Sequence, residues 1–443
     1  MNVSRRTFLV ANTAAASCAL LPKGLVAAVA AATPPMPQFK DWESVRAQFR
    51  TSREYLHFAG FYIASHPEPV RAAIEGYRRA IDDNPFLVVE RGLFESEADN
   101  VLNQVRGELA SYLGGRPEEI ALTENTTAGL TLVYNGLVLK PGDEILTTVH
   151  DHVVHHEAIR LSSERNGASV RKITLFDAAA SAMADGIVDR VRASIRPETR
   201  VLGITWVHSA TGIRLPIRRI ADVVQEVNRG RGDSQRVILV VDGVHGIGAV
   251  DVDIASMGAD FFCAGTHKWM FAPRGTGIVW APASNWARLR PLFPSFSDPE
   301  TYNAWVENRL PGTPTNAARV MPGGFHAFEH QWAMSAAFRF HQSIGRTRIA
   351  DRIADLNDRC KAGLAGIGKV TLHTPRNRQL SAGINCFEVE GVAPPDVVKR
   401  LLAKKIVAST SPYAKSYVRL AAGLLNTPEE VDQAVAAVRD VAA

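Results

Sequence analysis

Cysteine is scarce in this sequence, since its 443 residues include only four, at positions 18, 263, 360 and 386. The four are widely spaced and form no C-x-x-C pair, so the sequence lacks the zinc-site and thioredoxin-type motifs. They do not build a disulfide scaffold, although a single bridge stays open. The cysteines therefore say little about the redox compartment of the protein.

A long uninterrupted apolar run is also absent. A membrane-spanning helix needs about 20 consecutive apolar residues, and no stretch beyond residue 32 reaches that length. The net charge of +5 includes three charges from Arg5, Arg6 and Lys23, and the balance that remains gives no reason to expect nucleic acid as a partner. With 46% hydrophobic and 21% charged residues, the chain has the composition of a globular protein and the length for two packed domains.

The first 32 residues contain no acidic residue and have the order of an export signal. The segment SRRTFL at residues 4–9 precedes a mildly apolar, alanine-rich stretch, which is the pattern of a twin-arginine signal. Pro22 and Gly24 interrupt this stretch, which disfavours a spanning helix. An Ala-x-Ala sequence at residues 28–30 suits cleavage. We therefore expect a signal peptide over residues 1–32 and a periplasmic or secreted protein.

Helix-like and strand-like segments alternate from about residue 70 onward, which is typical of an α/β domain with a mainly parallel sheet. The predicted strands are 120–122, 144–147, 169–173, 201–205, 237–241 and 261–263. The predicted helices are 100–113, 127–135, 155–166, 217–228, 332–344, 349–364 and a last one from residue 428. The proline-rich segment 291–322 interrupts the alternation and predicts the crossover to a second domain.

A lysine follows an apolar strand in the segment ADFFCAGTHKW at residues 259–269. Lys268 would then lie at the carboxyl end of a strand, where ligands bind in open α/β folds. Burial at that position lowers the pKa of a lysine and makes its amine nucleophilic enough to form a Schiff base. On this segment alone, a solvated lysine in a loop is the alternative.

A second buried-strand pattern, at residues 237–241, ends in Asp242. Pyridoxal 5′-phosphate (PLP) works as an electron sink while its pyridine nitrogen stays protonated, and a buried carboxylate favours that state. An aspartate at a strand end is otherwise a helix cap or a turn residue. The lysine and the aspartate together favour a PLP site.

A third segment, IALTENTTAG at residues 120–129, is a strand followed by polar residues at the start of a helix. The free N–H groups at a helix N-terminus favour a phosphate, and the threonine hydroxyls add donors. Asn125, Thr126 and Thr127 are therefore candidates for holding the phosphate of the cofactor. An N-cap without any ligand is the alternative.

These three segments, in this order, resemble the class V aminotransferases among the fold-type I PLP enzymes, especially the isopenicillin N epimerase-like branch. The resemblance covers essentially the whole chain after the signal. It implies PLP as cofactor and an α/β fold with a mainly parallel seven-stranded sheet in a large domain, followed by a smaller α+β C-terminal domain. We expect the large domain, with an N-terminal arm, over residues 33–310 and the small domain over 311–443. The family also implies a homodimer.

The resemblance assigns roles at the cofactor. The residues implied to hold the phosphate are Asn125, Thr126, Thr127, Thr266 and His267. The residues implied to contact the ring are Asp242 at the pyridine nitrogen, His152 over the ring, and His245 and Ser209 near the phenolic oxygen. Lys268, Asp242 and His152 are the expected catalytic residues.

A segment near the C-terminus resembles the family's R-[IL]-S-x-x-x-Y-N-T motif. Its arginine corresponds to Arg419, whose paired donors match the geometry of a substrate carboxylate. Ala421 and Ala422 stand where serine and proline are usual in the family, which leaves the substrate open. Arg274 is expected to support the site or a dimer contact and not to be catalytic.

Two other cofactor classes fit the sequence poorly. The histidine-rich segment HDHVVHH at residues 150–156 matches neither the H-x-H-x-D-H pattern nor H-E-x-x-H, so we expect no metal. The glycines of residues 243–248 are in the wrong order for a dinucleotide fingerprint. A binding protein that keeps the fold without catalysis is the remaining alternative, and the presence of both Lys268 and Asp242 argues against it.

The sequence leaves the reaction open. Residues 405–419 contain no cysteine, which disfavours a desulfurase that works through a persulfide. Epimerisation at Cα, transamination, and oxidation or decarboxylation of a side group on an exported peptide such as a siderophore remain. We expect the substrate to be a free amino acid or an amino-acid-bearing peptide.

Overall fold

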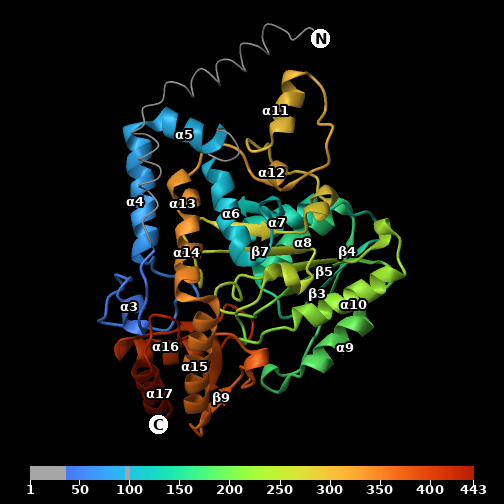
Figure 1. Cartoon of the computed structure of the whole chain (residues 1–443). Coiled ribbons are helices and arrows are strands. Elements are labelled where there is room, and N and C mark those ends of the chain that lie inside the picture. The colour runs from blue at the N-terminus through green and yellow to red at the C-terminus, as the bar shows by residue number, and fades with distance from the viewer. Residues whose placement is uncertain (1–35, 95–99) are drawn as a thin grey trace.

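A seven-stranded sheet forms the centre of the computed structural model, which describes residues 36–94 and 100–443 (Figure 1). The strands, in their order across the sheet, are β2 (Ile120–Thr123), β8 (Gly277–Trp280), β7 (Phe261–Gly265), β6 (Ile238–Asp242), β5 (Thr199–Thr205), β3 (Glu144–Thr148) and β4 (Ser169–Ile173). All neighbours pair in parallel except β8, which runs antiparallel to β2 and β7. The mainly parallel seven-stranded sheet that the resemblance implied is confirmed.

Every residue of the three strands β6, β7 and β8 is buried. Parallel strands that are buried on both faces read as continuous apolar runs, which is why β6 and β7 were predictable. The helices of this region are α7 (Thr126–Gly136), α8 (Val153–Asn166), α9 (Ala184–Ser194) and α10 (Ile217–Arg229). Helix α7 packs on α8, and α9 packs on α10.

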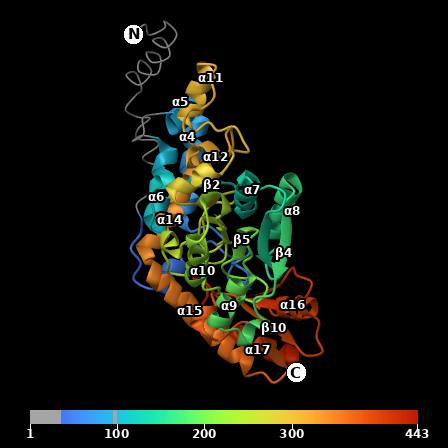
Figure 2. The same ribbon diagram turned by 90° about the vertical axis from the view of Figure 1, so that its right-hand side faces the viewer.

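The C-terminal part of the chain forms a four-stranded antiparallel sheet with three long helices. Its strands are β12 (Ser409–Thr410), β13 (Val418–Leu420), β10 (Asn385–Val389) and β9 (Val370–Leu372), and its helices are α15 (Arg346–Ala365), α16 (Pro394–Ala403) and α17 (Pro428–Ala442). Helix α17 begins with a capping box between Thr427 and Glu430. The smaller α+β unit is confirmed, and Figure 2 shows it at one end of the molecule.

The N-terminal segment of the described chain reaches this C-terminal unit. After the short helix α3 (Trp42–Arg46), strand β1 (Leu56–His57) pairs in parallel with β11 (Ile406–Val407). The next residue, Phe58, is fully buried in the C-terminal core. The chain then turns back toward the edge of the large sheet, so residues 61–63 come to line the cavity described below.

Residues 291–344 link the two units. The segment contains α11 (Pro299–Val306) and α12 (Ala317–Val320). The helix predicted at 332–344 corresponds to α14 (Met334–Ile344), and the short helix α13 (Phe328–Trp332) precedes it. Both α13 and α14 pack against α4 (Glu68–Asp83), and α14 also packs against α6 (Val101–Leu113). These helices share the core of the large sheet. The domain limits at residues 310 and 311 stay a prediction.

Helix α5 (Pro85–Phe94) completes the N-terminal helical layer, and Figure 1 shows it beside α4. The predicted signal at residues 1–32 lies outside the described residues. Within the described part of the chain, no helix combines the length and the apolar composition that crossing a bilayer requires.

Candidate active site

A cavity of about 340 Å³ opens at the carboxyl end of the parallel strands. Thr205 ends β5, Asp242 ends β6, and Lys268 follows β7 by three residues. These ends meet at one edge because the strands run in the same direction. The polar residues that line the cavity are Tyr62, Asn125, Thr126, Thr127, His152, Thr205, Ser209, Asp242, His245, His267, Lys268, Tyr413 and Arg419. The structure thus gathers all but one of the predicted site residues.

Lys268 and Asp242 have opposite pKa shifts with one cause. Burial lowers the pKa of Lys268 to about 8, against the opposing effect of Asp242. Burial raises the pKa of Asp242 to about 6, and its Oδ1 accepts a hydrogen bond of 3.1 Å from the N–H of Val244. Desolvation disfavours the charged form of both groups. Lys268 Nζ lies 3.2 Å from Nε2 of His245.

The start of α7 forms another wall of the cavity. Asn125 is the N-cap, and its Oδ1 accepts a hydrogen bond of 2.9 Å from the N–H of Ala128. The hydroxyl of Thr126 accepts a hydrogen bond of 2.7 Å from the N–H of Gly265, which ties α7 to β7. Thr127 lines the same wall. A helix N-terminus of this kind is suited to an anion.

Thr266 is the one predicted site residue that does not line the cavity. Its side chain is fully buried, and its hydroxyl lies 2.7 Å from the hydroxyl of Thr276. The hydroxyl of Thr266 thus contacts Thr276, and a phosphate contact at Thr266 stays a prediction. Its neighbour His267 does line the cavity, with a buried Nδ1 that has no partner among the described residues.

His152 and Ser209 lie beside a residue that the sequence analysis missed. His152 is the N-cap of α8, and its Nδ1 accepts a hydrogen bond of 3.3 Å from Val154 N–H. The hydroxyl of Tyr413 lies 2.9 Å from that of Ser209. The Tyr413 ring meets the edge of His152 at 5.9 Å between centroids. The signal for Tyr413 was its place in the loop directly ahead of Arg419.

Arg419 on β13 brings a cation from the C-terminal unit to the cavity. Its guanidinium donates hydrogen bonds of 3.2 Å to the carbonyl of Ser209 and 2.8 Å to the carbonyl of Thr410. The same group lies 4.7 Å from the ring centroid of Phe61. These contacts fix the orientation of the guanidinium while it still lines the cavity.

A buried network supports the site from behind. The hydroxyl of Tyr134 lies 2.7 Å from Nε2 of His155, whose Nδ1 lies 3.4 Å from the hydroxyl of Thr205. Asp151 accepts hydrogen bonds from the N–H groups of Thr148, at 3.0 Å, and Thr205, at 2.8 Å. Burial raises the pKa of Asp151, but His155, His208 and hydrogen bonds to Thr148 and Thr205 outweigh it, and the pKa falls to about 2. The loop carrying His152 is thereby anchored to β5.

The histidine-rich segment does not converge on one point. His150 stacks on Phe176, and His156 contacts the carbonyl of Thr148. Across residues 36–94 and 100–443, no group of three metal-ligating side chains comes together. Arg274 is exposed and is not part of the cavity wall.

The residues present fit PLP. Asp242 is a buried carboxylate with no ion-pair partner in the described part of the chain, and it faces the cavity. Such a group is costly unless a cation joins it, and a protonated pyridine nitrogen is one. The Nδ1 atom of His245 is also buried without a partner among the described residues. Lys268 supplies the amine, and the start of α7 with His267 supplies the anion site.

Taken together, the sheet, the C-terminal unit and this cavity define a fold-type I PLP-dependent enzyme. The chain belongs to the class V aminotransferase family, whose model matches residues 64–433. PLP is the cofactor of this family.

The chain is similar to two kinds of enzyme, an isopenicillin N epimerase and a probable cysteine desulfurase. The chain is 26% identical to isopenicillin N epimerase of Streptomyces clavuligerus over 409 residues, which cover 89% of this chain and 96% of the relative. It is 24% identical to a probable cysteine desulfurase of Pyrococcus abyssi over 374 residues, which cover 82% of this chain and 86% of the relative.

Solved structures share the fold. A cysteine desulfurase of Thermococcus onnurineus in its apo form superposes with a TM-score of 0.77 at 20% identity, covering 92% of this chain and 99% of that one. The cystine C–S lyase C-DES in complex with cysteine persulfide gives a TM-score of 0.77 at 22% identity, covering 88% of this chain and 98% of that one.

Proposed function

We propose that this protein is an exported PLP enzyme that acts at the α-amino carboxylate of an amino acid or of an amino-acid-bearing peptide, by transamination or epimerisation. One observation carries the proposal: Lys268, Asp242 and Arg419 line a single cavity of about 340 Å³. An amine, a carboxylate and a guanidinium are the three groups that such a site requires.

Each of these residues has its own task in the proposed reaction. When bound, PLP withdraws electrons from Cα of the amino acid, which allows a bond there to break. The amine of Lys268 is the base that accepts a proton from Cα and returns one, since burial lowers its pKa toward neutrality. Arg419 orients the substrate through its carboxylate. Asp242 would hold the positive charge that PLP carries at its pyridine nitrogen.

The cysteines disfavour the desulfurase alternative. Cys263, Cys360 and Cys386 are all buried, and none lines the cavity. Burial raises the pKa of the Cys386 thiol to about 12, whereas sulfur transfer needs a thiolate. A persulfide route therefore has no nucleophile among the described residues.

Export and assembly belong to the same proposal. The twin-arginine pattern at residues 4–9 supports delivery to the periplasm or the medium, and membership of the family supports a homodimer. Sedimentation of the purified holoenzyme and fractionation of cells that express the full chain measure these two points separately.

Product analysis tests the proposed reaction. The holoenzyme is incubated with free amino acids and with a glutamate-bearing peptide, and keto acid, D-isomer and carbon dioxide are scored by mass spectrometry. Keto acid or D-isomer supports the proposal, and Arg419→Lys should raise KM far more than it lowers kcat. Carbon dioxide as the main product would move the assignment to oxidative decarboxylation. No turnover with the cofactor intact would favour a binding protein.

A further inference from the structure

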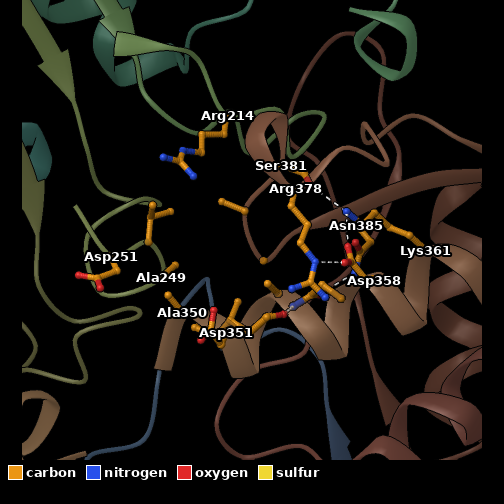
Figure 3. Close-up of a pocket in the computed structure, with 16 residues that line it drawn as sticks. Arg214, Ala249, Asp251, Ala350, Asp351, Asp358, Lys361, Arg378, Ser381 and Asn385 are labelled. Atoms are coloured by element: carbon orange, nitrogen blue, oxygen red, sulfur yellow. Dashed lines mark hydrogen bonds and ion pairs between the residues drawn. The ribbon is translucent and has the colours of Figure 1, made fainter. Parts of the chain in front are cut away.

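A second cavity, of about 240 Å³, lies between the large sheet and the C-terminal unit. Arg214 and residues 249–251 line one side, and α15 and the loop at residues 378–385 line the other (Figure 3). It shares no lining residue with the cavity that contains Lys268. Neither the family motifs nor the proposed reaction gives it a role.

Arg214 is the unusual residue of this cavity. In the described part of the chain, its guanidinium has no hydrogen-bond or ion-pair partner, and burial is the sole cause that lowers its pKa below the usual range. Figure 3 shows the side chain pointing into the space between Asp251 and Arg378. A partly buried cation without a counter-ion is costly, and an anion in the cavity would offset that cost.

The other cations of the wall are already engaged. Arg378 forms ion pairs with Asp355 and Asp358. The Nζ of Lys361 lies 2.9 Å from Asp358 and 2.8 Å from the hydroxyl of Ser381. Of the three cations that line the cavity, only Arg214 is left with all its donors available among the described residues.

An acid on the same side of the cavity as Arg214 is engaged as well. Asp251 accepts a hydrogen bond of 2.6 Å from Thr347 and lies 3.0 Å from Arg346. Asp251 therefore has partners other than the Arg214 guanidinium.

We propose that this cavity is a second binding site, which takes a small carboxylate with Arg214 as its anchor. The planar guanidinium offers two parallel donors to a carboxylate. Three acidic residues, Asp251, Asp351 and Asp358, share the wall and repel a multiply charged anion such as a phosphate. Ala249, Ile353 and Ala382 provide apolar surface for a short alkyl chain.

Equilibrium dialysis with radiolabelled propionate tests the site in the holoenzyme. Arg419→Gln serves as the background, so that the first cavity does not contribute. One saturable propionate site per chain is expected, with weaker binding of inorganic phosphate. Adding Arg214→Gln should lower the propionate affinity by about tenfold or more, the usual effect of losing a hydrogen bond to a charged group. Arg229→Gln, on the exposed side of α10, is the matched control and should change nothing.

Two results would overturn the proposal. If Arg214→Gln leaves propionate binding unchanged, Arg214 is not the anchor of the site. If phosphate binds more tightly than propionate does, the site is not specific for a carboxylate. If Arg419→Gln fails to fold, the otherwise wild-type holoenzyme gives the same answer by stoichiometry, because Arg214→Gln should then remove one of two propionate sites. If the otherwise wild-type holoenzyme has the Arg214-dependent propionate site but no Arg419-dependent one, that result counts against the proposed function and not against this second site.

Discussion

The amine of Lys268 lies 3.2 Å from Nε2 of His245 on the wall of the active-site cavity. Burial lowers the pKa of Lys268 to about 8 and that of His245 well below its usual value. His245 is therefore neutral at pH 7 and can accept a hydrogen bond from the lysine. Lys268 in turn loses its proton at a lower pH than an exposed lysine, and the neutral amine is the nucleophile.

The pH dependence of cofactor loading follows from this pair. With a pKa of about 8, about a tenth of Lys268 is neutral at pH 7. The rate at which the apoenzyme captures added PLP should rise with pH up to about 8 and then level off. Absorbance during reconstitution at a series of pH values measures this rate. A rate that still rises steeply at pH 10 would mean that Lys268 has the pKa of a solvated lysine.

Asp242→Asn should change stability and activity in opposite directions. The folded-state pKa of Asp242 is raised to about 6 from 3.8, so the folded apoenzyme holds its proton more tightly than the unfolded chain does. That contribution to stability is complete below pH 4 and is lost as pH rises through 6. At pH 8 the Asn variant of the apoenzyme should therefore be more stable than the wild type, by about 1–3 kcal/mol.

The same variant should lower kcat/KM by roughly 100-fold, about 2.7 kcal/mol, because the positive charge at the pyridine nitrogen loses its partner. Thermal melting of the apoenzyme and steady-state kinetics of the holoenzyme measure the two effects. Asp189→Asn, at an exposed position of α9, is the control. If the Asp242→Asn variant keeps full activity, Asp242 does not act on the cofactor.

Gly203→Ala tests the network behind the site. A Cβ at this position of β5 would lie 2.0 Å from the Tyr134 hydroxyl and 3.1 Å from Nε2 of His155. Overpacking of this kind costs about 1–3 kcal/mol, and adding Tyr134→Phe should recover part of it. Chemical denaturation of the single and double variants measures the coupling. Gly186→Ala on α9, where a Cβ meets nothing within 4 Å, should be neutral or stabilising.

The chemistry-bearing residues of the large sheet were predictable because strand ends carry a local signal. Asp242 and Lys268 follow continuous apolar runs, and the polar turn at Asn125 precedes a helix. Parallel strands then bring these ends to one edge, whatever the connecting loops do. No pattern in the sequence specifies which residues of one loop line the cavity, and of the neighbours Thr266 and His267 only His267 does so.

Contacts between distant segments were not predictable. Tyr413 reaches Ser209 across 204 positions of the chain, and the pairing of β1 with β11 joins two strands of two residues each. Segments this short have no periodicity to read. Helix α9 and strand β8 were missed for related reasons. The few buried residues of α9 are spread among polar neighbours, and β8 is a run of only four residues.

Borohydride reduction of the holoenzyme, followed by proteolysis and mass spectrometry, tests the central claim most directly. The account predicts that reduction bleaches the yellow colour and leaves one phosphopyridoxyl group on the peptide that contains Lys268. A Lys268→Ala variant should carry no such group. Labelling of a different lysine, or a labelled Lys268→Ala variant, would contradict the account.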